Sequence, residues 1–138
     1  MGRLDKDSEG LVLMTNQGEL SDLLMRGRNR HEKEYVVRVD TVVTADFLSS
    51  MERGVYLKEL NVTTRKCRAW KTGEDSFHII LTQGLNRQIR RMCMAEGCRV
   101  KSLKRIRIMN VELGELKSGE YRALDGQELA QLKRLAGI

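Results

Sequence analysis

The sequence predicts an α+β fold built on a mixed, largely antiparallel sheet with flanking helices. Segments with strand-like and helix-like patterns alternate along the chain. Several neighbouring strand-like segments are joined by connections too short for the crossovers that parallel strands require. The 138 residues contain no proline, no internal repeat and no low-complexity linker, so a single domain over residues 1–138 is expected.

The first third of the chain is predicted to contain a strand, a helix and a second strand. The continuous apolar run at 11–15 is typical of a buried strand. Residues 17–26 follow with a helical pattern, and the leucines at helical spacing are Leu20, Leu23 and Leu24. Residues 33–39 are rich in β-branched and aromatic side chains, which favour a strand.

The middle of the chain is predicted to form a helix followed by two strands. Thr44 is suited to cap the N-terminus of a helix over 44–53, and Gly54 is suited to end it. The apolar stripe of this helix consists of Phe47, Leu48 and Met51. Residues 60–70 and 76–82 have strand patterns and are joined by a short polar turn.

The last third is predicted to place a strand between two helices. Asn86 follows a glycine turn and is expected to cap a helix over 87–96. Residues 103–113 alternate in the manner of a strand. Asp125 is expected to cap a final helix over 127–135.

Basic residues are concentrated in one part of the sequence. The chain has 25 Lys and Arg against 19 Asp and Glu, which gives a net charge of +6. Between Gly84 and Arg107 there are eight basic residues and a single acid, Glu96. A face with this charge suits phosphate groups, and a solvated arginine-rich surface is the ordinary alternative.

Composition argues against several classes of protein. No apolar stretch approaches the roughly 20 residues of a membrane-spanning helix, and we expect no leader-like segment. The cysteines are odd in number and lack metal-ligand spacing: Cys67, Cys93 and Cys98. Reduced thiols in a cytoplasmic protein without a bound metal are therefore expected.

The segment 2–11 places an acid, Asp5, between basic neighbours and ahead of a glycine turn. A carboxylate at this point of a basic protein suggests an acid that works on a polyanionic substrate. The spacing of Asp5, Asp7 and Glu9 also overlays a calcium-binding loop. That alternative fails at the twelfth position, where Asn16 cannot supply a bidentate carboxylate. A solvated acidic turn is the structural alternative.

A second group of interest is the segment 84–92, in which a glycine turn leads into an arginine-rich helix. Free backbone N–H groups at a helix N-terminus favour anions. Arg87, Arg90 and Arg91 share one helical face and offer planar donor forks. A phosphate or carboxylate partner is favoured over an arginine-rich helix that only faces solvent.

The third group is Lys33-Glu34-Tyr35, at the start of a predicted strand. Only 4% of the residues are aromatic, so a tyrosine beside a lysine at this position is distinctive. Aromatic faces stack on nucleic-acid bases, and neighbouring cations hold phosphates. A half-buried strand tyrosine is the structural alternative.

Together these segments resemble the pseudouridine synthases of the RsuA-like family, which modify ribosomal RNA. The matching motifs extend over essentially the whole chain: Gly2-Arg3-Leu4-Asp5 with Gly10-Leu11, Lys33-x-Tyr35, Asn86-Arg87-Gln88-Ile89-Arg90-Arg91-Met92, and Val100-x-x-Leu103-x-Arg105. The motifs look most similar to RluF-type members, which act on the large ribosomal subunit. The resemblance implies the family's α+β catalytic fold and a cofactor-free isomerisation of a uridine within RNA.

The resemblance also implies roles for particular residues. Asp5 matches the family's catalytic aspartate, which acts as nucleophile or base at the sugar. Tyr35 matches the tyrosine that stacks on the target base, and Arg90 matches the arginine that pairs with the catalytic carboxylate. The residues expected to contact RNA are Arg3, Lys6, Lys33, Asn86, Arg87, Gln88, Arg91 and Arg105.

Ribosomal RNA is the expected partner, with transfer RNA as the other candidate, and a monomer that needs no protein partner and no membrane is expected. Family members usually carry further residues before the catalytic motif, often including an S4-type RNA-binding domain, and the chain is expected to lack these. A non-catalytic RNA-binding module with the same fold is the alternative from another class. A third hypothesis, an enzyme of free nucleosides, is disfavoured by the broad arginine-rich surface.

Overall fold

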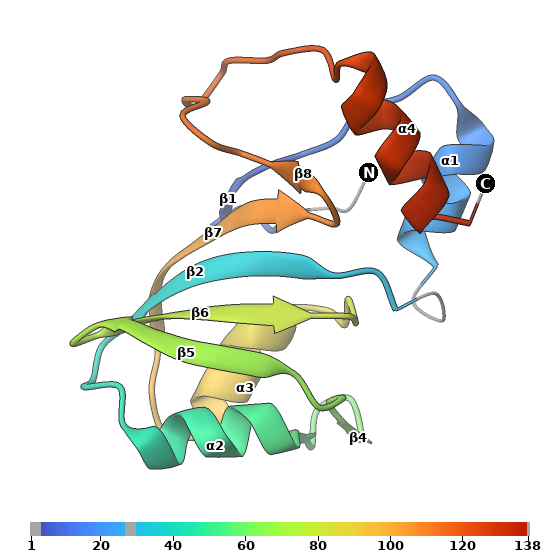
Figure 1. The fold of residues 1–138 in the computed structure, drawn as a ribbon. Helices are drawn as coiled ribbons and strands as arrows, with labels where there is room; N and C mark the ends of the chain where they lie inside the picture. Colours follow the sequence, from blue (N-terminus) through green and yellow to red (C-terminus); the bar gives the residue numbers. More distant parts are fainter. Residues whose placement is uncertain (1–3, 27–29, 138) are drawn as a thin grey trace.

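The computed structural model describes residues 4–26 and 30–137, and it has the predicted α+β architecture. The strands of the main sheet are β1 (Glu9–Gly10), β2 (Lys33–Val39), β5 (Arg68–Gly73), β6 (Ser76–Leu81), β7 (Val100–Ile108) and β8 (Val111–Glu112). Their order is β1-β7-β2-β6-β5, with β8 as a further partner of β7 (Figure 1). The β1–β7 pair is parallel and the other described ladders are antiparallel, which confirms a mixed, largely antiparallel sheet.

Helices flank this sheet in two places. They are α1 (Gly18–Met25), α2 (Ala45–Arg53), α3 (Gln88–Ala95) and α4 (Gly126–Leu135), and a small separate hairpin consists of β3 (Tyr56–Leu57) and β4 (Val62–Thr63). In Figure 1, α2 and α3 lie against one face of β2, β6 and β5, whereas α1 and α4 lie together beyond β7 and β8. None of the helices in the described ranges is long and apolar enough to cross a membrane.

Two apolar cores follow from this arrangement. The larger core joins the sheet to α2 and α3, and its fully buried side chains include Val37, Phe77 and Ile79, which alternate onto the helix side of their strands. The smaller core joins the segment after β1 to α1, β8 and α4, with Leu132 at its centre. The larger core holds α2 and α3 against the sheet, and the smaller core holds the N-terminal segment against β7.

Elements with strong local signals form as predicted. The strand at 33–39 has the predicted bounds. Thr44 caps α2, because its Oγ1 accepts a hydrogen bond from the Phe47 N–H at 3.1 Å. Asp125 caps α4 in the same way, with Oδ1 accepting from the Glu128 N–H at 2.7 Å. Caps and alternation act within a few residues, so the sequence displays them directly.

The strand predicted at 11–15 is wrong. The paired strand is β1, and pairing with β7 ends where the Leu11 N–H donates to the Arg105 carbonyl at 2.8 Å. Further along the same edge of β7 lies β8, which pairs with Arg107 and Ile108. The segment at 11–15 therefore has no free edge to join, and it buries Leu11 and Leu13 in the smaller core without a ladder.

Two predicted long strands are each divided. The segment 60–70 breaks at Thr64, whose N–H and Oγ1 both bond to the Val55 backbone, so β4 pairs with β3 and β5 pairs with β6. The segment 103–113 reverses at Met109, where φ is +54°, and returns as β8. The residue at this tight turn is a buried methionine, and no glycine or proline stands there to indicate a turn in the sequence.

Candidate active site

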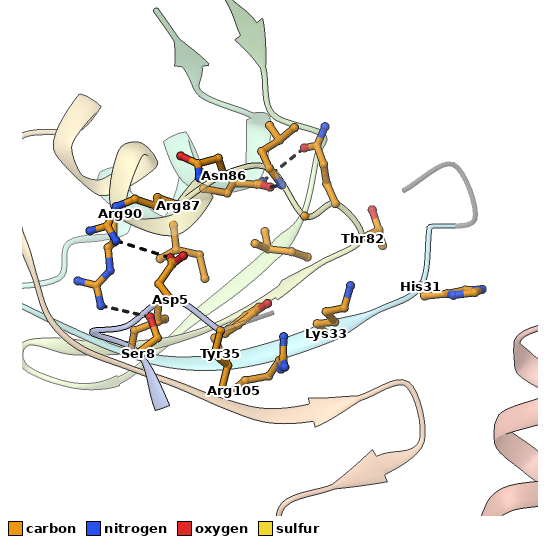
Figure 2. A pocket seen from close by; sticks show the side chains of 18 of the residues that line it. Asp5, Ser8, His31, Lys33, Tyr35, Thr82, Asn86, Arg87, Arg90 and Arg105 are labelled. Carbon is orange, nitrogen blue, oxygen red and sulfur yellow. Dashed lines mark hydrogen bonds and ion pairs between the residues drawn. The ribbon is translucent and has the colours of Figure 1, made fainter. Parts of the chain in front are cut away.

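A pocket of about 510 Å³ opens where the N-terminal segment, β2 and the turn before α3 meet. Figure 2 shows Asp5, Ser8, Arg87 and Arg90 at one end of this pocket, with Tyr35 and Lys33 following along β2. The three segments singled out from the sequence are thus brought together in space. The described residues contain no cluster of three or more His, Cys, Asp and Glu side chains that could hold a metal ion.

The segment that carries Asp5 is fixed by a short turn and a close backbone contact. The Ser8 N–H donates to the Asp5 carbonyl at 3.0 Å. Gly10 has φ of +119° and lies so near β7 that an added Cβ would be 2.2 Å from the Arg105 carbonyl oxygen. Only glycine fits this combination of conformation and space. Its proximity to β7 determines where Asp5, with its side chain 36% exposed, enters the pocket.

The helix that carries the arginines begins differently from the prediction. Arg87 is the N-cap residue of α3, in the left-handed region with φ of +48°. Asn86 is not the cap: its Oδ1 accepts from Arg91 Nη2 at 2.8 Å, and its carbonyl accepts from Arg91 Nε at 2.9 Å. The buried Gln88 side chain supports the turn, because its Oε1 accepts from the Leu85 N–H at 3.2 Å.

Two arginines of α3 meet the acidic segment. Arg87 donates to both carboxylate oxygens of Asp7, each at 3.2 Å, and lies 3.8 Å from Asp5 Oδ2. Arg90 donates to the Asp7 carbonyl at 2.8 Å and to Ser8 Oγ at 3.3 Å. The hydrogen bond from Arg87 lowers the pKa of Asp7, with Arg90 adding to the effect.

The expected pairing of Arg90 with Asp5 is therefore not the one observed. Among the described residues, the arginine within ion-pair distance of Asp5 is Arg87, and Arg90 instead holds the backbone two residues further on. Arg90 positions the segment that presents Asp5. Arg87 provides the nearby positive charge.

Tyr35 and Lys33 reach the pocket from the same face of β2, because alternate side chains of a strand point the same way. Tyr35 is half-buried and packs against the larger core. Burial lowers the pKa of Lys33, and the positive charge of Arg105 lowers it further. Arg105 itself is 1% exposed and donates from Nε to the Leu11 carbonyl at 2.8 Å.

The predicted site residues divide into three groups. Those that line the pocket are Asp5, Lys33, Tyr35, Asn86, Arg87, Gln88, Arg90 and Arg105. Lys6 and Arg91 lie outside the lining, with Lys6 exposed and Arg91 engaged with Asn86. Arg3 lies outside the described residues.

Sequence reasoning assigned no site role to Asp7, Ser8, Arg26 or His31. Asp7 was weighed only as a calcium ligand, although it stands in the same motif as Asp5. Ser8 and His31 both line the pocket, as does Arg26. His31 lies two residues before Lys33 and outside β2, so strand alternation could not have identified it.

This arrangement suits chemistry by a carboxylate at an electrophilic carbon. Asp5 reaches the pocket beside the Arg87 guanidinium, and a carboxylate can act there as a nucleophile or a base. The half-buried ring of Tyr35 provides a surface on which a flat heterocycle could stack. Cations around the pocket suit a substrate that carries phosphates.

Comparisons with known proteins find relatives among enzymes of RNA modification. A family model described as RNA pseudouridylate synthase matches residues 1–95. A crystal structure of a pseudouridylate synthase superposes with a TM-score of 0.90 at 30% identity, covering 97% of this chain and 57% of the other.

Three curated relatives show similar extents of alignment. The dual-specificity RNA pseudouridine synthase RluF of Escherichia coli (strain K12) is 49% identical, over 98% of this chain and 46% of its own. An uncharacterized RNA pseudouridine synthase of Aquifex aeolicus (strain VF5) is 40% identical, over 97% and 56%. The ribosomal large subunit pseudouridine synthase B of Bacillus subtilis (strain 168) is 34% identical, over 99% and 57%. The chain thus spans about half the length of the curated relatives it matches.

Proposed function

The chain belongs to the RNA pseudouridylate synthase family, and on that premise we propose that it isomerises a uridine within RNA to pseudouridine. The observation that carries the proposal is the meeting of Asp5, Tyr35, Arg87 and Arg90 in one pocket. The proposed substrate is ribosomal RNA, in particular that of the large subunit, with transfer RNA as the other candidate. Relatives whose names specify RNA and the large ribosomal subunit support this choice.

The proposed reaction rearranges the atoms of one nucleotide and consumes no co-substrate, and the resemblance to the family implies that it uses no cofactor. The N1–C1′ bond breaks, the base rotates, and a C5–C1′ bond forms. The proton on C5 then leaves, and N1 gains a proton, so that the composition is unchanged. Asp5 acts at the sugar as nucleophile or base, and Tyr35 supports the base while it is detached.

A uridine within structured RNA must leave its stack before C1′ can be reached. An aromatic ring in the pocket offsets part of the lost stacking. Arg87 and Lys33 lie on either side of Tyr35 along the pocket, where they would hold the phosphates of the extruded nucleotide (Figure 2). We propose that the chain acts as a monomeric catalytic unit on cytoplasmic RNA.

The proposal is tested by incubating the protein with unmodified large-subunit, small-subunit and transfer RNA transcripts. Pseudouridine is then mapped by primer extension after carbodiimide treatment. One new stop in a single transcript is the expected result, and it identifies the substrate as well as the activity. RNA binding without a new stop would instead favour a non-catalytic RNA-binding module.

Substitutions of Tyr35 should separate its ring from its hydroxyl. Tyr35→Ala is expected to weaken RNA binding about tenfold, because base–aromatic stacking contributes roughly 1–3 kcal/mol per base. Tyr35→Phe keeps the ring and should bind normally. If the hydroxyl assists removal of the C5 proton, Tyr35→Phe should slow single-turnover formation of pseudouridine by roughly a hundredfold.

The exposed Tyr121 provides a matched control, since Tyr121→Ala removes a ring that is not part of the pocket lining. Thermal unfolding of each variant checks that Tyr35→Ala has not simply lost its fold. A wild-type rate for Tyr35→Phe would exclude proton transfer by the hydroxyl and leave stacking as the role of this residue.

A further inference from the structure

The pocket continues beyond Tyr35 along β2. Lys33 and Tyr35 are alternate residues of β2, so their side chains project on one side of the strand, and His31, which precedes the strand, also lines the pocket. Figure 2 shows them in a row leading away from Asp5. At about 3.3 Å per residue in a strand, Lys33 lies roughly 7 Å from Tyr35 along β2.

The two ends of the pocket differ in charge. At the Asp5 end, carboxylates and guanidinium groups are paired. At the other end stand three side chains, which we call the far-end cluster: the cations Arg26 and Lys33, and His31, whose pKa is lowered by burial. Asp5 is the single acid among the described lining residues, so the far-end cluster has no carboxylate facing it across the pocket.

Lys33 is central to the far-end cluster. Its ammonium group has no hydrogen-bond or ion-pair partner within the described part of the chain. Burial and the nearby Arg105 both lower the pKa of Lys33, which means that its charged form is held at a cost. An anion bound between these side chains would remove that cost.

We propose that the far-end cluster binds a backbone phosphate of the RNA strand next to the uridine that is placed over Tyr35. This inference rests on the proposed function. The far-end cluster and the Asp5 end belong to one continuous pocket, so a single strand can occupy both. The contact would fix which nucleotide beside the phosphate reaches Asp5, and the far-end cluster would thus determine register along the strand.

A binding experiment tests the contact without requiring turnover. The probe is a single-stranded RNA nonamer with one central uridine among adenosines. Each phosphate is replaced in turn by an uncharged methylphosphonate, and binding is measured for wild type and Lys33→Met. In wild type, replacement at one linkage beside the uridine should weaken binding roughly tenfold, as expected for a charge-assisted contact.

Lys33→Met keeps the length of the side chain and removes its charge. It should weaken binding of the unmodified nonamer by a similar factor and lose sensitivity at that one linkage alone. Lys33→Arg restores the charge and should restore the sensitivity. Lys71→Met is the matched control, because Lys71 is exposed on β5 outside the pocket lining, and it should keep the wild-type profile.

An identical profile in wild type and Lys33→Met would overturn the proposed contact, as would a wild type without any sensitive linkage beside the uridine. These outcomes are separable from failure of the proposed function. If pseudouridine forms but binding shows no Lys33-dependent sensitive linkage, only the proposed phosphate contact is refuted. If the Lys33-dependent linkage is found but no pseudouridine forms, the proposed isomerase activity is refuted and the nucleic-acid contact stands.

Discussion

Asp5→Asn is expected to abolish pseudouridine formation while RNA affinity and stability stay close to wild type. The amide is nearly isosteric with the carboxylate but can neither attack C1′ nor accept a proton from the sugar. Removal of a nucleophile or essential base typically lowers the rate by a thousandfold or more. Single-turnover mapping of pseudouridine measures this loss, and filter binding measures the affinity.

Asp22→Asn is the matched control for Asp5→Asn. It makes the same chemical change at an exposed position of α1 that is not part of the pocket lining. It should leave the rate unchanged. Asp5→Ala is the second variant to be measured, because the asparagine of Asp5→Asn can deamidate slowly back to aspartate and alanine cannot. Turnover near the wild-type rate in Asp5→Ala would show that another group performs the chemistry.

Gly10→Ala is expected to cause the largest loss of stability, about 3 kcal/mol in the free energy of unfolding. The new Cβ would lie 2.2 Å from the Arg105 carbonyl oxygen and 2.4 Å from the Arg105 nitrogen, and the φ of +119° is strained for alanine. Backbone atoms of a paired strand cannot give way as a side chain can. Urea unfolding measures the change.

The same substitution should also lower activity, because β1 must move away from β7 and carry the Asp5 segment with it. Gly18→Ala is the matched control: no atom lies within 4 Å of its added Cβ, and it stands at the start of α1. It should be neutral or stabilising by up to about 1 kcal/mol. Wild-type stability in Gly10→Ala would contradict the close approach of β1 to β7.

Parts of the fold that depend on local signals could be predicted from the sequence. The strand at 33–39 and the caps at Thr44 and Asp125 are of this kind. The prediction of a strand at 11–15 is wrong because β8 occupies the edge of β7 that this segment would have joined. The chain reaches that edge through a turn at Met109. Competition for one strand edge is a tertiary effect, and no window of sequence contains it.

The candidate site shows the same division. Motif spacing identified the residues that line the pocket, yet it could not assign which arginine faces which acid. Arg87 and Asp7 are 80 positions apart, and their pairing depends on how α3 starts. The helix begins after Arg87, which adopts the left-handed conformation, and not after Asn86 as predicted. This later start sets the direction of the helical side chains, so that Arg90 reaches the Asp7 backbone.

The close pairing of β1 with β7 has a consequence for the timing of biosynthesis. Arg105 holds the Leu11 carbonyl across 94 positions of sequence, so the acid is translated long before the strand that anchors it. At roughly 5–20 residues per second, the delay on the ribosome is about 5 to 20 seconds. Asp5 lacks its anchor throughout that interval, and it lacks its guanidinium neighbour until Arg87 has been translated. The emerging polypeptide is therefore expected to be inert toward the RNA around it until β7 has been synthesised, and catalytic competence should arrive late and abruptly.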